Sequence, residues 1–299
     1  MARDQGRRRV RHGHHRRRQR DHDHQLHLLS PAVRTELAAV PQAEHVHVRL
    51  DPETVTAAYV RQRRRFAAWV ATLDEATLAS RTRCAKWTVA DVLLHGCDVD
   101  GWMRSIWSGT LPLDTFDPRT TPHESVMTGR SIADREVRDR YVASAEAMAA
   151  DVAASAPDRW GLPSLVPAGP VPWWMSLLHV LYDSSLHERD ARLPLGLAAA
   201  HDPDEETVVL AWSLAIVGLF GSDELDAIVA GVRVTAGAGL VTVAPVGDAR
   251  DAGVPVLRGD PAVVSDALSG RGSLDDALDG HPAIVHRLGS LARFFTTPL

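Results

Sequence analysis

The sequence predicts a mainly helical protein, in which a four-helix bundle is followed by a smaller α+β domain. Four long segments between residues 51 and 197 repeat apolar residues at helical spacing. From residue 203 onward, short runs of β-branched residues alternate with further helical segments. Hydrophobic residues make up 45% and charged residues 24% of the 299 positions, which is ordinary for a globular protein with a sizeable core.

The first 50 residues have no hydrophobic period, and we expect residues 1–50 to be a disordered tail. They hold 11 Arg, 5 acidic residues and 8 of the 15 histidines. A nucleic-acid tail or a metal-binding tract is the functional alternative to a solvated extension. The rest of the chain holds 22 Lys+Arg and 33 Asp+Glu, a balance of −11, so the folded part is not expected to bind nucleic acid.

Cysteine content and hydropathy argue against a secreted or membrane protein. Cys84 and Cys97 are the two cysteines, too few for a disulfide framework or a cysteine-based zinc site, and this usage fits a reducing cytoplasm. No apolar run reaches the roughly 18–20 residues that a membrane span needs. The N-terminal arginines are not followed by an apolar segment, so they do not form a secretory signal. We therefore expect a cytoplasmic protein.

The first two bundle helices have recognisable starting signals. Pro52 occupies the first turn of a segment whose apolar residues recur at helical spacing as far as Leu73. A second helix is expected over residues 89–107, because Thr88 and Asp91 match the capping box, in which a Ser or Thr is followed three residues later by an acid.

The other two helices are predicted over 131–155 and 173–192, where the sequence LPLG follows the fourth helix. Turn-forming residues dominate 109–130 and 156–172, which are predicted as connections. Together the four helices form a bundle over residues 51–197.

The predicted C-terminal domain covers residues 203–299 and mixes the two kinds of secondary structure. Strands are expected in the segments GVRVTA, LVTVAPV and VPVLRGD. Helices are expected in TVVLAWSLAIVGLF, PAVVSDALSG and HPAIVHRLGSLARFF.

Two stretches, WTVADVLLH and HVLYDSSLHERDA, carry the candidate chemistry. Asp183 and His187 are four residues apart, so they project from one face of a helix and can hold one metal ion. His95 is the best candidate for a third ligand from another helix, because it follows a buried apolar run where an unpartnered imidazole is costly. Two nitrogens and one carboxylate oxygen leave a fourth position open, as in catalytic zinc sites, for a water or a thiolate. The alternative is that these are ordinary buried histidines.

Three nearby residues have open alternatives. Asp91 either caps its helix, which we favour, or accepts the imidazole N–H of His95. His179, one turn before Asp183, is either a group near the metal or substrate or an interior polar residue. Cys84 and Cys97 are expected to be structural.

The same two stretches resemble the mycothiol-dependent maleylpyruvate isomerase family of actinobacteria, within the DinB-like superfamily. WTVADVLLHG is similar to the family's Trp-Thr-x-x-Asp-x-x-x-His element, and DSSLHERDA is similar to its carboxylate-x-x-x-His-x-x-Asp-Ala element. The resemblance implies metal ligands at His95, Asp183 and His187, and mycothiol as cosubstrate. The family usually has Glu at the position of Asp183 and often has Trp at that of Arg189. It also implies an arginine from the C-terminal domain, for which Arg271 is the nominee and Arg287 the second choice.

The functional hypothesis is a metal-dependent enzyme, with zinc or another divalent ion, that activates a low-molecular-weight thiol such as mycothiol. The thiol would attack a small electrophilic substrate, in an isomerisation or an S-transfer. One alternative is a non-catalytic module that binds a small ligand and uses its histidines structurally. Another is a regulatory protein that uses the basic tail. The substrate and the oligomeric state do not follow from the sequence.

Overall fold

A computed structural model describes residues 46–108, 120–154, 159–167, 169–220, 224–246 and 253–296. All of them belong to one compact unit formed by residues 41–111 and 117–299. Residues 1–50 were predicted to be a disordered tail, and residues 1–45 lie outside the described part of the chain. The end of this segment is ordered instead, because β1 (Val46–Val48) pairs in parallel with β6 (Leu240–Pro245).

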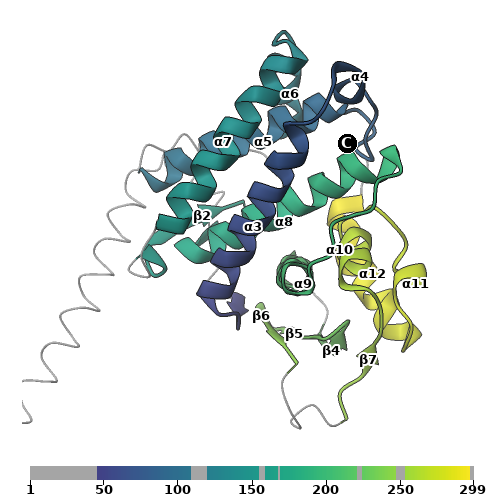
Figure 1. The fold of residues 1–299 in the computed structure, drawn as a ribbon. Coiled ribbons are helices and arrows are strands. Elements are labelled where there is room, and N and C mark those ends of the chain that lie inside the picture. Colours follow the sequence, from purple (N-terminus) through teal and green to yellow (C-terminus); the bar gives the residue numbers. More distant parts are fainter. Residues whose placement is uncertain are drawn as a thin grey trace, which may run out of the picture. The chain divides into compact units, whose positions relative to one another are not determined.

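The four predicted bundle helices are α3 (Pro52–Val70), α5 (Val89–Trp107), α7 (Asp134–Ala154) and α8 (Trp173–Arg192). The side chain of Asp51 accepts the backbone N–H of Thr54 and caps α3, with Pro52 in the first turn as expected. Helix α3 packs against α7 and α8, and α5 packs against the same two helices (Figure 1).

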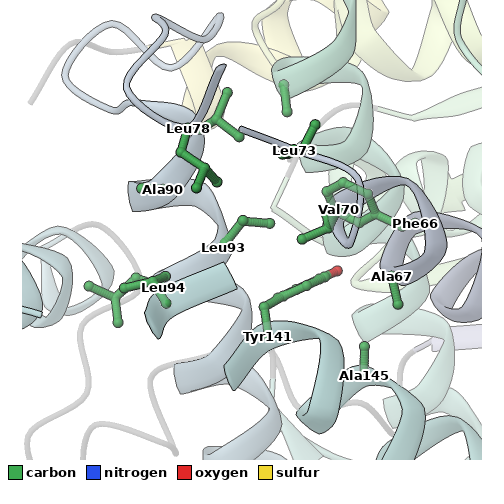
Figure 2. Close-up of a cluster of buried hydrophobic side chains, with 13 residues drawn as sticks. Phe66, Ala67, Val70, Leu73, Leu78, Ala90, Leu93, Leu94, Tyr141 and Ala145 are labelled. Atoms are coloured by element: carbon green, nitrogen blue, oxygen red, sulfur yellow. The ribbon is translucent and has the colours of Figure 1, made fainter. Parts of the chain in front are cut away.

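The core of the bundle fills the space between α3, α5 and α7. Phe66 and Tyr141 meet edge to face, with ring centroids 5.3 Å apart (Figure 2). Gly96 lets the Tyr141 ring pack directly against α5, because a Cβ at this position would lie 2.6 Å from the ring. The cluster of buried side chains comprises Phe66, Ala67, Val70, Leu73, Leu78, Val89, Ala90, Leu93, Leu94, Val137, Tyr141, Ala145 and Ala191.

Two predicted connections contain secondary structure. Residues 109–130 were expected to be a loop, but α6 (Thr121–Gly129) is a helix; residues 109–119 lie outside the described part. Pro122 lies in the first turn of α6, and Val126 is fully buried against the bundle, so tertiary contacts stabilise a segment of weak periodicity. The connection before α8 contains a hairpin of β2 (Pro163–Val166) and β3 (Gly169–Pro172). A short helix, α4 (Glu75–Leu78), follows α3.

The C-terminal part joins a five-stranded sheet to helices. The strand order is β1-β6-β5-β4-β7, and the new members are β4 (Leu225–Val229), β5 (Val232–Gly237) and β7 (Val256–Leu257). Strand β5 is antiparallel to both of its neighbours. The sequence indicated β5, β6 and β7 but not β1 or β4.

Helix α9 (Pro203–Phe220) lies between the bundle and the sheet (Figure 1). It contacts α3 and α8 on one side and β5 and β6 on the other. Helices α10 (Pro261–Leu268) and α12 (Pro282–Thr296) were expected, whereas the one-turn α11 (Leu274–Ala277) and the 3-10 turn Leu193–Leu195 were not. The division into domains at residues 197–203 stays a prediction. Among the described residues, none of the helices combines the length and the apolar character needed to cross a bilayer.

Candidate metal centre

His95 is presented by α5, whose start is determined by the predicted capping box. Thr88 Oγ1 accepts the backbone N–H of Asp91 at 3.2 Å, and Asp91 Oδ2 accepts the backbone N–H of Thr88 at 2.8 Å. The three apolar residues before His95 are buried, and the His95 side chain itself is 9% exposed. An imidazole in this setting needs a polar partner.

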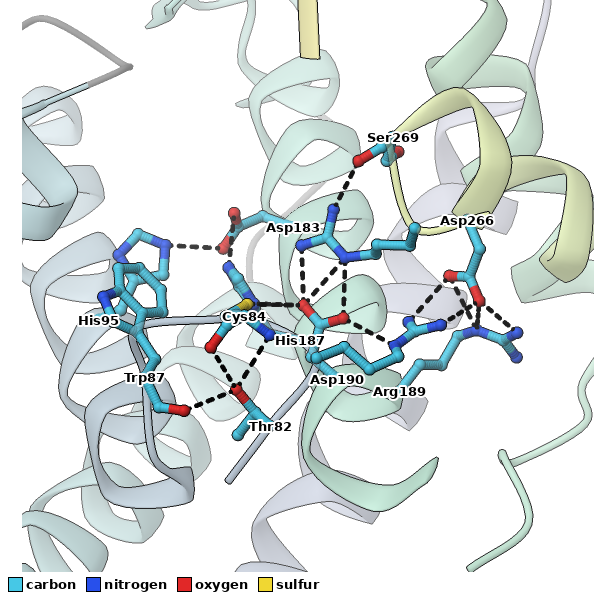
Figure 3. Close-up of polar contacts among 12 residues, drawn as sticks. Thr82, Cys84, Trp87, His95, Asp183, His187, Arg189, Asp190, Asp266 and Ser269 are labelled. Atoms are coloured by element: carbon cyan, nitrogen blue, oxygen red, sulfur yellow. Dashed lines mark hydrogen bonds and ion pairs between the residues drawn. The ribbon is translucent and has the colours of Figure 1, made fainter. Parts of the chain in front are cut away.

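Helix α8 supplies that partner and a second imidazole. His95 Nε2 lies 3.5 Å from one carboxylate oxygen of Asp183, and His187 Nε2 lies 3.6 Å from the other (Figure 3). One ligand atom from each of the three residues falls within 4.8 Å of the other two. The structure therefore brings together the three predicted ligands, from two helices that are in contact. That they bind a metal stays a prediction.

The three donors fit a divalent ion such as zinc. Both N···O separations exceed the roughly 2.7–3.2 Å of an N–H···O hydrogen bond. The two separations end on different oxygens of Asp183, and each is close to the separation of about 3.4 Å expected between two ligands that share a tetrahedral ion at about 2.1 Å. Burial opposes ionisation of Asp183, but the charges of His187 and His95 outweigh it and lower the pKa of the carboxyl group. The Asp183 side chain is also 26% exposed, so a further ligand can reach its carboxylate.

Asp190 holds His187 from the opposite side of the ring. Its Oδ2 lies 3.0 Å from His187 Nδ1, and the Asp190 side chain is fully buried. Burial raises the pKa of Asp190, but the hydrogen bonds from His187 and Arg271 outweigh it and keep the carboxyl group ionised at neutral pH. An ionised Asp190 accepts the Nδ1–H of His187, which leaves Nε2 as the nitrogen that can bind an ion.

Arg271, the nominated catalytic residue, contacts Asp190 rather than the three candidate ligands. Its Nε and Nη2 lie 2.8 and 2.7 Å from the two carboxylate oxygens, and its Nη1 donates to the carbonyl oxygen of Ser269. Arg287, the second choice, is exposed on α12 and donates to the carbonyl oxygen of Glu224. Of the two nominees, Arg271 is the one joined to the centre, through one intervening carboxylate.

Trp87 covers both imidazoles, a role that sequence reasoning missed. Its ring centroid lies 5.2 Å from that of His95 and 5.7 Å from that of His187. Its indole N–H donates to Nδ1 of His123 on α6 at 3.2 Å, which holds the ring in place. The sequence indicated only that Trp87 stands before a helix cap, because nothing in the local pattern places it over α8.

Cys84 also lies at the centre, although the sequence indicated only a structural residue in a loop. Its Sγ is 3.2 Å from Asp190 Oδ2 and 3.9 Å from His187 Nδ1. The loop reaches α8 because the backbone N–H of Arg83 donates to the carbonyl oxygen of Asp190. Burial, reinforced by the charge of Asp190, raises the pKa of Cys84 to about 12, so the thiol is protonated at neutral pH.

The remaining candidates have other contacts. Asp91, besides capping α5, accepts two hydrogen bonds from Arg130, which supports the capping interpretation. Cys97 packs beside the hydrophobic cluster of the bundle. His179 lies one turn before Asp183 on α8 and receives a hydrogen bond from Trp212 of α9.

Comparisons with known proteins agree with the resemblance and with the fold. Residues 59–192 match the family model described as the mycothiol maleylpyruvate isomerase N-terminal domain. Crystal structures of the mycothiol-dependent maleylpyruvate isomerase and of a variant with one histidine replaced by alanine superpose with a TM-score of 0.55, at 17% and 16% identity. Each match covers 78% of this chain and 94% of the other. No curated protein sequence matches significantly. The predicted fold class, a DinB-like bundle followed by an α+β part, is confirmed.

Proposed function

We propose that the protein is a metal-dependent enzyme that activates a low-molecular-weight thiol, because residues 59–192 match the model of the mycothiol maleylpyruvate isomerase N-terminal domain. Mycothiol is the proposed cosubstrate, and the second substrate is a small electrophile. The observation that carries the proposal is the convergence of His95, Asp183 and His187 from two helices.

These three residues would hold a divalent ion, with zinc the first choice for two imidazoles and one carboxylate. When bound, such an ion would lower the pKa of a coordinated thiol and so would supply a thiolate near neutral pH. Asp183 is one methylene shorter than the Glu usual in the resembling family. Its two oxygens nevertheless lie 3.5 and 3.6 Å from the two imidazole nitrogens, so the shorter side chain reaches both.

Other residues of the centre would prepare these ligands. Asp190 keeps the proton of His187 on Nδ1, and Arg271 and Arg83 hold Asp190 ionised and in place. Trp87 limits the access of water to both imidazoles. Cys84 donates to Oδ2 of Asp190 and lies 3.9 Å from Nδ1 of His187, so it contributes to holding both side chains.

The same thiol chemistry serves an isomerase or a transferase. Addition of the thiol sulfur to an electron-poor double bond forms a C–S bond and moves an electron pair onto the substrate. Rotation about the resulting single bond and elimination of the thiol give an isomer, whereas retention of the C–S bond after protonation gives S-transfer.

The test is the metal content of the full chain, measured by plasma mass spectrometry after purification and after dialysis against zinc. We expect about one zinc per chain in the wild type and loss of most of it in His187→Ala, since two ligands hold zinc much less tightly than three. His201→Ala is the matched control, because His201 is 72% exposed and pairs with Glu206. A mycothiol-consumption assay with maleylpyruvate as first probe then follows.

Two outcomes would count against the proposal. A wild-type protein that stays metal-free after dialysis, with full stability, would favour the non-catalytic ligand-binding alternative. Equal zinc content in His187→Ala and His201→Ala would place the ion elsewhere.

A further inference from the structure

His179 is the histidine of α8 that the proposed function leaves without a role. It precedes Asp183 by four residues and His187 by eight, so the three side chains follow one stripe that drifts by about 40° per four residues. The imidazole of His179 therefore lies one helical turn from Asp183, on the same side of α8.

Trp212 determines which nitrogen of His179 carries the hydrogen. The indole Nε1 of Trp212 can only donate, and it lies 3.1 Å from His179 Nδ1. Nδ1 must be the acceptor, so the hydrogen of the neutral ring sits on Nε2. Burial lowers the pKa of His179 to about 4, and the ring is neutral at neutral pH. Trp212 is itself 2% exposed, and α9 holds it against α8.

The Nε2–H of His179 is a donor without a partner among the residues that the structure describes. The hydrogen bond from Trp212 engages the other nitrogen. The His179 residue as a whole is partly exposed. An oriented neutral donor of this kind can bind an oxygen of a ligand that enters beside Asp183.

We propose that the Nε2–H of His179 donates a hydrogen bond to a carboxylate or carbonyl oxygen of the electrophilic substrate, and that Trp212 is the positioning residue that keeps this donor in place. The inference rests on the proposed function, because it places the electrophile beside the thiol. When the sulfur adds to a conjugated double bond, the electron pair moves onto such an oxygen. The neutral imidazole stabilises the developing charge and keeps its own proton.

The first test is the tautomer of His179, read from long-range ¹H–¹⁵N NMR spectra of the full chain at pH 7 with zinc added. We expect a protonated Nε2 and an unprotonated Nδ1 in the wild type. Trp212→Phe keeps an aromatic ring but removes the indole N–H, and we expect it to show a mixture of both tautomers. A protonated Nδ1 in the wild type would overturn the inference.

The second test uses succinate, a dicarboxylate that cannot accept a thiol, as the probe. The ¹⁵N shift of His179 Nε2 should move when succinate binds. His179→Phe should raise the Kd of succinate by about fivefold, as expected for the loss of one neutral hydrogen bond. His179→Gln, which retains an amide donor, should recover part of this loss, and His201→Gln should leave the Kd unchanged.

Zinc content, measured in each sample, separates this inference from the proposed function. Absence of a succinate-dependent shift at His179, or equal succinate affinity in His179→Phe and wild type, overturns the role of His179 even when zinc is retained. A wild type without zinc overturns the proposed function, while the tautomer set by Trp212 is still measured in the same sample.

Discussion

At the scale of single residues, Asp190 connects the candidate metal centre to the rest of the protein. Its fully buried carboxylate contacts the His187 ring, the Cys84 thiol and the guanidinium groups of Arg83 and Arg271. Two cations and an imidazole N–H make the ionised form favourable at a buried position. Asp190 therefore determines the orientation of His187 without being a ligand itself.

Asp190→Asn should lower the zinc affinity of the protein by about 10–100-fold. A neutral amide oxygen accepts the Nδ1–H of His187 less strongly than a carboxylate does, and the amide NH2 group cannot accept it at all. The measurement is competition for zinc with a chromophoric chelator. Asp139→Asn is the control, since Asp139 is 63% exposed and pairs with the adjacent Arg138. Equal affinities in the two variants would contradict the role given to Asp190.

At the scale of elements, α9 is the helix that packs against both the four-helix bundle and the five-stranded sheet. Its middle, from Val208 to Leu219, is largely buried, because α3, α8, α10 and the sheet all contact it. Its first turn carries Glu205, which lies 2.8 Å from Arg65 and is 5% exposed in its side chain. Burial raises the pKa of Glu205 to about 7, against the opposing effect of Arg65.

The raised pKa of Glu205 has a consequence for stability. Between about pH 4.5 and 7 the folded protein holds a proton that the unfolded chain has released, so this group makes unfolding easier as pH rises through that window. Glu205→Gln stays neutral at every pH and should show a smaller loss of stability between pH 5 and pH 8 than the wild type. Urea unfolding at both pH values measures the difference.

Glu136→Gln on α7 is the matched control because Glu136 is 55% exposed and pairs with Arg140, which does not titrate in this pH range. It should keep the pH dependence of the wild type. Identical pH dependence in Glu205→Gln and the wild type would show that Glu205 titrates normally.

At the scale of the whole molecule, Asp266 fastens α10 to the bundle. It accepts hydrogen bonds from Arg83, in the loop that carries Cys84, and from Arg189 on α8. Arg189 stands where the resembling family often has Trp, and in this chain it has gained a partner from the C-terminal part. Because Arg83 also contacts Asp190, the same contacts connect α10 to the candidate metal centre.

Asp266→Asn should lower the free energy of unfolding by about 2–4 kcal/mol, because the partly buried guanidinium group of Arg189 loses its counter-charge and that of Arg83 keeps only Asp190. Both arginines keep some contact with water, which reduces the penalty relative to a fully buried pair. Urea denaturation measures the change. Asp226 is exposed and pairs with Arg233, so Asp226→Asn should change the free energy of unfolding by less than about 0.5 kcal/mol. A similarly small change for Asp266→Asn would contradict this role.

Much of the architecture followed from the sequence, because helix signals are local. The capping box at Thr88 and Asp91 and the proline at the start of α3 predicted helix starts that the structure contains. Helix α6 and strand β4 were missed, since both are short and depend on partners distant in the chain. Strand β1 was missed for the same reason, as its partner lies almost 200 residues away.

The sequence by itself determined that Asp183 and His187 share one face of α8, because helical geometry makes residues four apart neighbours. It also indicated that His95 needed a polar partner. Only the tertiary structure decided that α5 lies against α8 with His95 facing Asp183, and that Trp87, Cys84, Arg83 and Arg271 gather around the same centre. The physical reason is that these contacts join residues 81 to 107 positions apart in the chain, and packing rather than local propensity selects them.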